Sequence, residues 1–113
     1  QFRMPTYLNK NKDGMMIEAC AGLLDENDPK TAIIKEIEEE TGYRIKTVEK
    51  VFESYMSPGS VTEILHFFIA AYTEDQKVSE GGGAADETEN IEVLEFSFTE
   101  ALALIKSGEI KDA

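Results

Sequence analysis

The chain has 113 residues, and this length predicts a single domain, 1–113, with a core of its own. It carries 11 basic and 23 acidic residues, and the net charge of −12 argues against nucleic acid or an anionic membrane as a partner. Cys20 is the only cysteine, which excludes an internal disulfide and favours a reducing compartment, the cytoplasm. Apolar runs are all shorter than the roughly 18 residues that indicate a membrane span.

The first elements are predicted to be two strands of a hairpin. Residues 1–8 (QFRMPTYL) and 15–22 (MMIEACAG) have strand-like composition, and the turn at 9–14 contains Asp13-Gly14, which suits a hairpin. Because the chain begins with Gln1 and not Met, within the first of these strands, we expect a piece of a longer polypeptide, truncated at both ends.

A helix is predicted next. Asp28 is a good N-cap, Pro29 is favoured at the first helical position, and Gly42 is a good C-terminal stop. One face of this helix is apolar and is expected to pack on a sheet, and it carries Ile33, Ile34 and Ile37.

The second half is predicted to contain further strands at 48–56, 61–72 and 91–98. The run at 61–72 is almost continuously apolar, which is typical of the middle of a sheet, so its His66 is expected in the core or on a sheet face. Between the last two strands, the polar stretch at 73–90 is either a floppy excursion or an active-site loop. This mixture predicts the α/β class with a mixed sheet.

The final helix has clear boundaries. Ser97 and Glu100 form the pattern of a capping box, and Gly108 ends the helical segment.

The helix at 29–41 carries an acidic cluster whose like charges repel, formed by Glu36, Glu38, Glu39 and Glu40. On a helical wheel Glu38 points away from the other three. Carboxylates four residues apart deliver oxygen ligands to one spot, so Glu36 and Glu40 with Glu39 beside them are candidates for binding a hard cation such as Mg²⁺. The alternative is a solvated acidic face.

Residues 22–43, GLLDENDPKTAIIKEIEEETGY, resemble the Nudix box, G-x5-E-x7-R-E-U-x-E-E-x-G-U, in which U is a bulky apolar residue. The second half matches position by position, through Lys35, Glu36, Ile37, Glu39, Glu40, Gly42 and Tyr43. Lys35 in the Arg position keeps a charge that can pair with Glu39. The first half is one residue shorter than the pattern, so the position of its early Glu falls on Glu26, Asn27 or Asp28.

The whole chain is similar to the nucleoside-diphosphate-sugar branch of the Nudix hydrolases. The shared features are the turn at 57–59, a glycine-rich acidic loop and the ending GEIKDA, and YMSPGSVTEILHFFIA and GGGAADETENIEVLEF look most like the members that act on GDP-mannose. The resemblance implies a Nudix α/β/α sandwich with a mixed sheet. It also implies Mg²⁺-dependent hydrolysis of GDP-mannose to GMP and mannose 1-phosphate, with ADP-ribose pyrophosphatase or a non-catalytic nucleotide-binding domain as alternatives.

The resemblance also implies the site. Mg²⁺, or Mn²⁺ as the alternative, would be held by Glu36, Glu39, Glu40 and the backbone carbonyl of Ala21. The general base would be Glu87 or Glu89 of the late loop, or a glutamate of the box, Glu39 or Glu40. The loop glycines, Gly81 to Gly83, would let this loop close over the substrate and open again.

Further contacts follow from the same resemblance. Ser57 and Gly59 are expected to contact substrate, and Arg3 either contacts phosphate or forms a structural ion pair. Glu18 lies either near the metal ions or in a buried salt bridge. The partner is expected to be a small nucleotide sugar, and the protein a homodimer through parts that are partly missing here.

Overall fold

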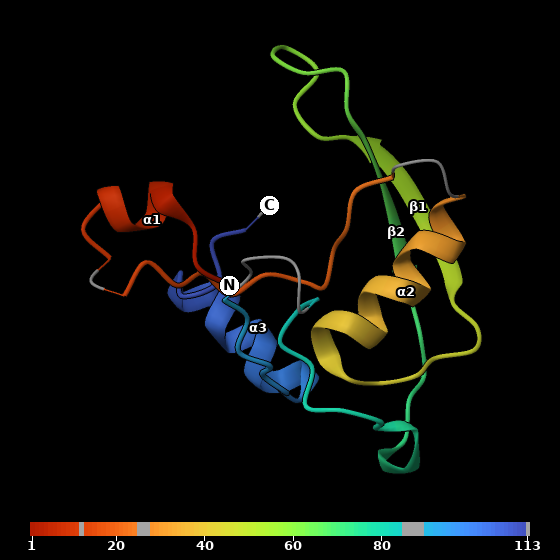
Figure 1. Cartoon of the computed structure of the whole chain (residues 1–113). Helices are drawn as coiled ribbons and strands as arrows, with labels where there is room; N and C mark the ends of the chain where they lie inside the picture. The colour runs from red at the N-terminus through yellow and green to blue at the C-terminus, as the bar shows by residue number, and fades with distance from the viewer. Residues whose placement is uncertain (12, 25–27, 85–89, 113) are drawn as a thin grey trace.

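The computed structural model describes residues 1–11, 13–24, 28–84 and 90–112. Its elements in chain order are α1 (Met4–Leu8), α2 (Pro29–Thr41), β1 (Glu49–Tyr55), β2 (Ile64–Ile69), the short 3-10 helix η1 (Glu74–Gln76) and α3 (Phe98–Ser107). Figure 1 shows α2 beside the β1–β2 sheet on one side of the molecule, and α1 and α3 on the other. The combination of helices and strands confirms the predicted α/β class.

The boundaries of α2 follow its sequence signals. The side chain of Asp28 accepts hydrogen bonds from the backbone N–H groups of Lys30 and Thr31, at 3.1 and 3.4 Å. Gly42 ends the helix with a φ of 80°, a left-handed conformation that glycine adopts without steric strain. The helix therefore begins and ends at the residues that its capping signals predict.

The sheet is smaller than expected. Strands β1 and β2 form a two-stranded antiparallel sheet in which Glu53 lies opposite His66. Within the described residues β2 pairs with β1 alone, so the prediction that 61–72 lies in the middle of a sheet is wrong for this part of the chain, and the strand itself is shorter. An apolar run indicates burial, but it does not specify which strands become neighbours. His66 is half-buried on the sheet, as expected.

The core lies between α2 and the sheet. Its buried members follow the end of the helix in sequence and are Tyr43, Ile45 and Val48. Partly buried side chains from α2 and from β2 pack against them, namely Ile33, Ile34, Ile37 and Phe68. The apolar face predicted for this helix is therefore confirmed, and this packing fixes the helix relative to the sheet.

The N-terminal strand prediction is wrong. Residues 4–8 form α1, and antiparallel pairing is reduced to one bridge between Phe2 and Met15. Pro5 explains the difference, because proline has no N–H to donate to a sheet but fits the first turn of a helix.

Two further predicted strands are not formed in the part of the chain that the structure describes. Residues 15–22 are irregular apart from the bridge at Met15, and 91–97 contain no strand. A strand needs a neighbour that pairs with its N–H and C=O groups, and alternating apolar residues cannot supply that neighbour.

Helix α3 begins and ends as predicted. Ser97 accepts a hydrogen bond from the backbone of Glu100, and the Glu100 carboxylate accepts one from the backbone N–H of Ser97 at 2.9 Å. Gly108 ends the helix with a φ of 79°. Among the helices of the described ranges, none combines the length and the apolar character that crossing a membrane requires.

Candidate active site

The carboxylates of Glu36 and Glu40 on α2 converge on the segment that precedes the helix. Glu40 is only 8% exposed. Its Oε2 atom accepts a hydrogen bond from the backbone N–H of Ala21 at 3.2 Å. The carboxyl group of Glu36 occupies the space that a Cβ at position 22 would fill, so Gly22 is needed for this close approach. Two carboxylates one helical turn apart thus meet Ala21 and Gly22.

Glu39 has a different partner. Its Oε2 atom accepts a hydrogen bond from Nζ of Lys35 at 2.9 Å, one helical turn earlier. This is the ion pair expected between these two positions, and it is partly exposed. The pair holds the Glu39 side chain along α2, whereas Glu36 and Glu40 contact the Ala21-Gly22 segment.

Glu38 lies outside this group, as the helical wheel predicted. Its two carboxylate oxygens accept hydrogen bonds from Nε and Nη2 of Arg44, at 2.9 and 2.8 Å. The paired guanidinium lowers the pKa of Glu38. Glu38 therefore pairs with a residue that follows the helix, and its charge is directed away from the other three carboxylates.

Arg3 and Glu18 form a bidentate ion pair. Nε and Nη2 of Arg3 donate to the two oxygens of Glu18, at 2.7 and 2.6 Å. This hydrogen bonding raises the pKa of Arg3. The Glu18 side chain is 13% exposed and the Arg3 side chain 45%, so this salt bridge is buried on the Glu18 side and open to solvent on the Arg3 side.

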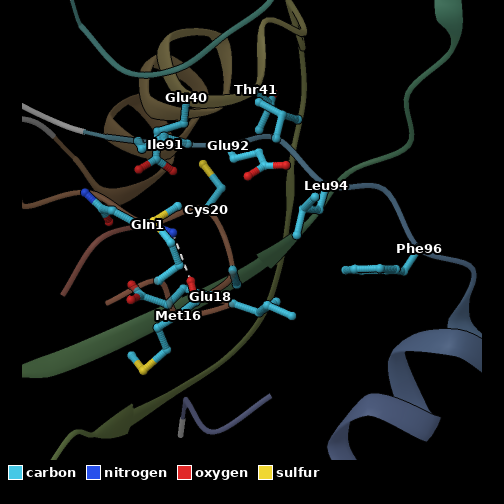
Figure 2. Close-up of a pocket in the computed structure, with 14 residues that line it drawn as sticks. Gln1, Met16, Glu18, Cys20, Glu40, Thr41, Ile91, Glu92, Leu94 and Phe96 are labelled. Carbon is cyan, nitrogen blue, oxygen red and sulfur yellow. Dashed lines mark hydrogen bonds between the residues drawn. The ribbon is translucent and has the colours of Figure 1, made fainter. Parts of the chain in front are cut away.

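A cavity of about 260 Å³ lies beside Glu40. It is lined by Gln1, by residues 15–20, by Glu40 and Thr41, and by 91–94 with Phe96. In Figure 2, Glu40 and Thr41 lie at one end, Glu18 and Met16 at the other, and Cys20 and Glu92 between them. Pockets that enclose a drug-sized ligand have volumes of about 300–1,000 Å³, so this cavity is slightly smaller than such a pocket.

Tyr43 links the end of α2 to segments far away in sequence. Its hydroxyl donates a hydrogen bond to Glu95 at 2.8 Å, and its ring packs edge-on against Tyr72 with centroids 4.7 Å apart. The bond to Glu95, together with burial, raises the pKa of Tyr43 to about 12. Sequence reasoning treated Tyr43 only as the apolar end of the motif and missed Glu95, because residues 52 positions apart carry no local signal of pairing.

Two candidate substrate contacts lie elsewhere. Ser57 and Gly59 belong to an exposed turn in which the carbonyl of Ser57 accepts from the backbone N–H of Ser60 at 2.9 Å. Figure 1 shows the loop between β1 and β2 projecting away from α2 and α3, and neither residue lines the cavity. The structure does not bring them to the carboxylates of α2. The loop candidates Glu87 and Glu89 lie outside the described residues.

The described residues contain no group of three or more His, Cys, Asp or Glu side chains placed to hold a metal ion. Two carboxylates, Glu36 and Glu40, nevertheless converge on the backbone of Ala21 and Gly22. Mg²⁺ is commonly bound through one or two carboxylates, with water and substrate phosphates completing its shell. The donor set at this position therefore fits a hard cation that is shared with a phosphate group.

Residues 4–112 match the NUDIX domain family. The chain is 59% identical over 112 residues to a GDP-mannose pyrophosphatase of Yersinia enterocolitica, and the match covers 99% of this chain and 58% of that protein. The GDP-mannose pyrophosphatase of Cronobacter sakazakii is 57% identical over 113 residues, covering 100% of this chain and 58% of that protein.

A GDP-mannose pyrophosphatase of Escherichia coli K12 is similar to the same extent, with 55% identity over 112 residues, 99% of this chain and 58% of that protein. The chain thus spans 58% of the length of these relatives. The family match extends over nearly all of the chain and includes the helix that carries the converging carboxylates. The chain belongs to the Nudix family.

Proposed function

We propose that the protein containing this chain hydrolyses the diphosphate bond of GDP-mannose and releases GMP and mannose 1-phosphate. Membership of the Nudix family supports a diphosphate hydrolase, and relatives that are 55–59% identical and named GDP-mannose pyrophosphatase support the substrate. The observation that carries the proposal is the placement of Glu40. Its carboxylate is buried against the Ala21 amide, on the helix that carries the acidic residues of the family motif.

Glu36, Glu39, Glu40 and the carbonyl of Ala21 are the proposed ligands for Mg²⁺, with Mn²⁺ as the alternative. When bound, such an ion neutralises phosphate oxygens and lowers the pKa of a coordinated water. The chain itself prepares the ligands. Burial and the Ala21 amide orient Glu40, whereas the ion pair with Lys35 orients Glu39.

Hydrolysis also requires a base for the attacking water. The water oxygen bonds to phosphorus, its proton passes to a carboxylate, and the bond from phosphorus to the bridging oxygen breaks. Glu87 or Glu89 is the proposed base, with the box glutamates Glu39 and Glu40 as the alternative.

Three residues are the proposed substrate contacts. Ser57 and Gly59 would contact the nucleotide sugar through the exposed turn between β1 and β2. A phosphate contact by Arg3 would use Nη1 or the second N–H of Nη2, because Nε–H and one N–H of Nη2 are donated to Glu18.

We also propose a cytoplasmic homodimer that does not bind nucleic acid. The net charge of −12 opposes association with a polyanion. Every residue of β1 is exposed, including Phe52 at 53% and Tyr55 at 62%, and large exposed apolar side chains favour a further protein interface. Light scattering on the full-length protein tests this, and a monomeric mass at micromolar concentration would contradict the dimer.

Phosphorus NMR tests the function. The full-length protein is mixed with Mg²⁺ and equimolar GDP-mannose and ADP-ribose, and the diphosphate signals are followed with time. Selective loss of GDP-mannose with growth of GMP and mannose 1-phosphate supports the proposal. Faster loss of ADP-ribose would keep the chemistry and overturn the substrate, and no change in either signal would favour a non-catalytic binding domain.

A further inference from the structure

The carbonyl groups at the C-terminal end of α2 are bound by a loop distant in sequence. The backbone N–H of Gly82 donates to the carbonyl of Glu40 at 2.8 Å, and that of Gly83 donates to the carbonyl of Glu39 at 3.1 Å. The last carbonyls of a helix have no partner within the helix and must find one elsewhere. Here the two carbonyls belong to two of the proposed metal ligands.

The contact between helix and loop leaves no room for side chains. Gly81 has a φ of 69°, and a Cβ at this position would lie 2.7 Å from the carbonyl carbon of Thr41. Gly42 has a φ of 80°, and a Cβ there would lie 2.9 Å from the backbone nitrogen of Gly81. Both separations are shorter than real Cβ contacts, so backbone packs directly on backbone at both glycines.

The residues that precede Gly81 also form backbone hydrogen bonds, to the residues just after α2. The backbone N–H groups of Val78 and Ser79 donate to the carbonyl of Gly42, at 2.8 and 3.3 Å, and the N–H of Arg44 donates to the carbonyl of Gln76 at 2.9 Å. The segment 76–83 is therefore hydrogen-bonded both to the last turn of α2 and to the residues that directly follow the helix. Gly81 to Gly83 were expected to let the loop close and open, and in this structure Gly82 and Gly83 are hydrogen-bonded to α2.

We infer that Gly81, Gly82 and Gly83, the glycine clamp, are positioning residues that fix the last turn of α2, which carries the proposed metal ligands Glu39 and Glu40. This inference rests on the proposed function. A hydrogen-bonded carbonyl fixes its peptide plane, and the peptide plane sets the direction in which the side chain leaves the backbone. A metal site binds its ion well only when the ligand atoms are held within about 0.5 Å of the productive geometry.

A pair of alanine variants tests the glycine clamp in the full-length protein. Gly81→Ala introduces a Cβ that collides with the backbone of α2, whereas Gly108→Ala, at the end of α3, meets nothing within 4 Å. The two glycines have φ values of 69° and 79°, so alanine imposes similar backbone strain in both variants. The dissociation constant for Mg²⁺, measured by calorimetric titration without substrate, is the readout.

We expect Gly81→Ala to weaken Mg²⁺ binding about tenfold or more, as loss of a supporting group around a metal ligand does, and Gly108→Ala to bind as the wild type does. Equal affinity in Gly81→Ala and wild type would overturn the inference and leave the proposed function standing. If the wild type itself bound no Mg²⁺, the proposed metal site would fail and the inference with it.

Hydrogen exchange on the wild type covers the case in which Gly81→Ala does not fold. The amides of Gly82 and Gly83 should exchange as slowly as amides inside α2, because both are bonded to its carbonyls. Exchange at the rate of open loop amides would show that the glycine clamp does not hold the helix, and it would overturn the inference without any metal measurement.

Discussion

The amide of Ala21 and the carboxylate of Glu40 are joined by a hydrogen bond of 3.2 Å, although the two residues lie 19 positions apart. The bond connects the irregular segment before the Nudix motif to the last full turn of α2. It places a buried carboxylate next to the backbone that is proposed to share its cation. The chemistry of the chain is therefore expected to depend most on this one side chain.

Glu40→Gln tests the carboxylate directly. Glutamine has the same shape and keeps an oxygen that can accept from Ala21, but it removes the charge. We expect folding to be retained and turnover of GDP-mannose to fall by more than the roughly 100-fold known for groups that merely support a metal ligand. Initial rates by phosphorus NMR and thermal melting are the measurements. Glu49→Gln, at an exposed position of β1, is the control and should leave the rate unchanged, and near-normal turnover in Glu40→Gln would falsify the metal assignment.

Gly22→Ala tests whether Glu36 must lie where the structure places it. The new Cβ would occupy the position of the Glu36 carboxyl group, and a flexible side chain can move aside without unfolding the protein. We expect the melting temperature to change little and Mg²⁺ affinity to fall by about 10- to 100-fold. Calorimetric titration measures the affinity. Gly108→Ala, which meets nothing within 4 Å, serves as the control, and unchanged affinity in Gly22→Ala would remove Glu36 from the ligand set.

The hydrogen bond from Tyr43 to Glu95 predicts a stability that depends on pH. The pKa of Tyr43 is raised from its usual 10.0 to about 12, so the contribution of the neutral hydroxyl is complete below pH 10 and is lost as pH rises toward 12. We expect wild type to be more stable than Tyr43→Phe at neutral pH, with the difference shrinking between these limits. Urea unfolding of both proteins from pH 8 to 12 checks this, and a difference that is constant across the range would contradict it.

The small core predicts strong sensitivity at Ile45. This side chain is 5% exposed and lies in the cluster that joins α2 to β2. Ile45→Ala should lower the free energy of unfolding by about 2–5 kcal/mol, the usual effect of removing a buried isoleucine side chain. Ile69 is 60% exposed, and Ile69→Ala should cost less than about 1 kcal/mol, the span of strand propensities. Urea denaturation measures both, and equal losses would show that the core lies elsewhere.

Helix boundaries were predictable because the signals that set them are local. Asp28, Gly42, Ser97 and Gly108 act on backbone groups within a few residues, and each lies where the sequence placed it. The separate position of Glu38 on α2 was predictable for the same reason. Helical geometry alone separates Glu38 from the other three and brings Lys35 to Glu39.

Strand pairing was predicted less well. Pro5 favours the helix that residues 4–8 form in place of the predicted strand. The segments 15–22 and 91–97 have strand-like composition but no strand partners in the described residues. Composition reports how well a residue fits a sheet, whereas the hydrogen bonds of a strand come from another part of the chain.

The sequence by itself determined the family motif, the two long helices with their caps and the face of α2 that carries Glu36 and Glu40. Only the tertiary structure decided what those carboxylates meet. It brought Ala21 to Glu40, and it packed Gly81 against the end of α2. These contacts join residues far apart in sequence through backbone atoms. Because nearly every residue type has the same backbone atoms, the pattern of side chains does not predict such contacts.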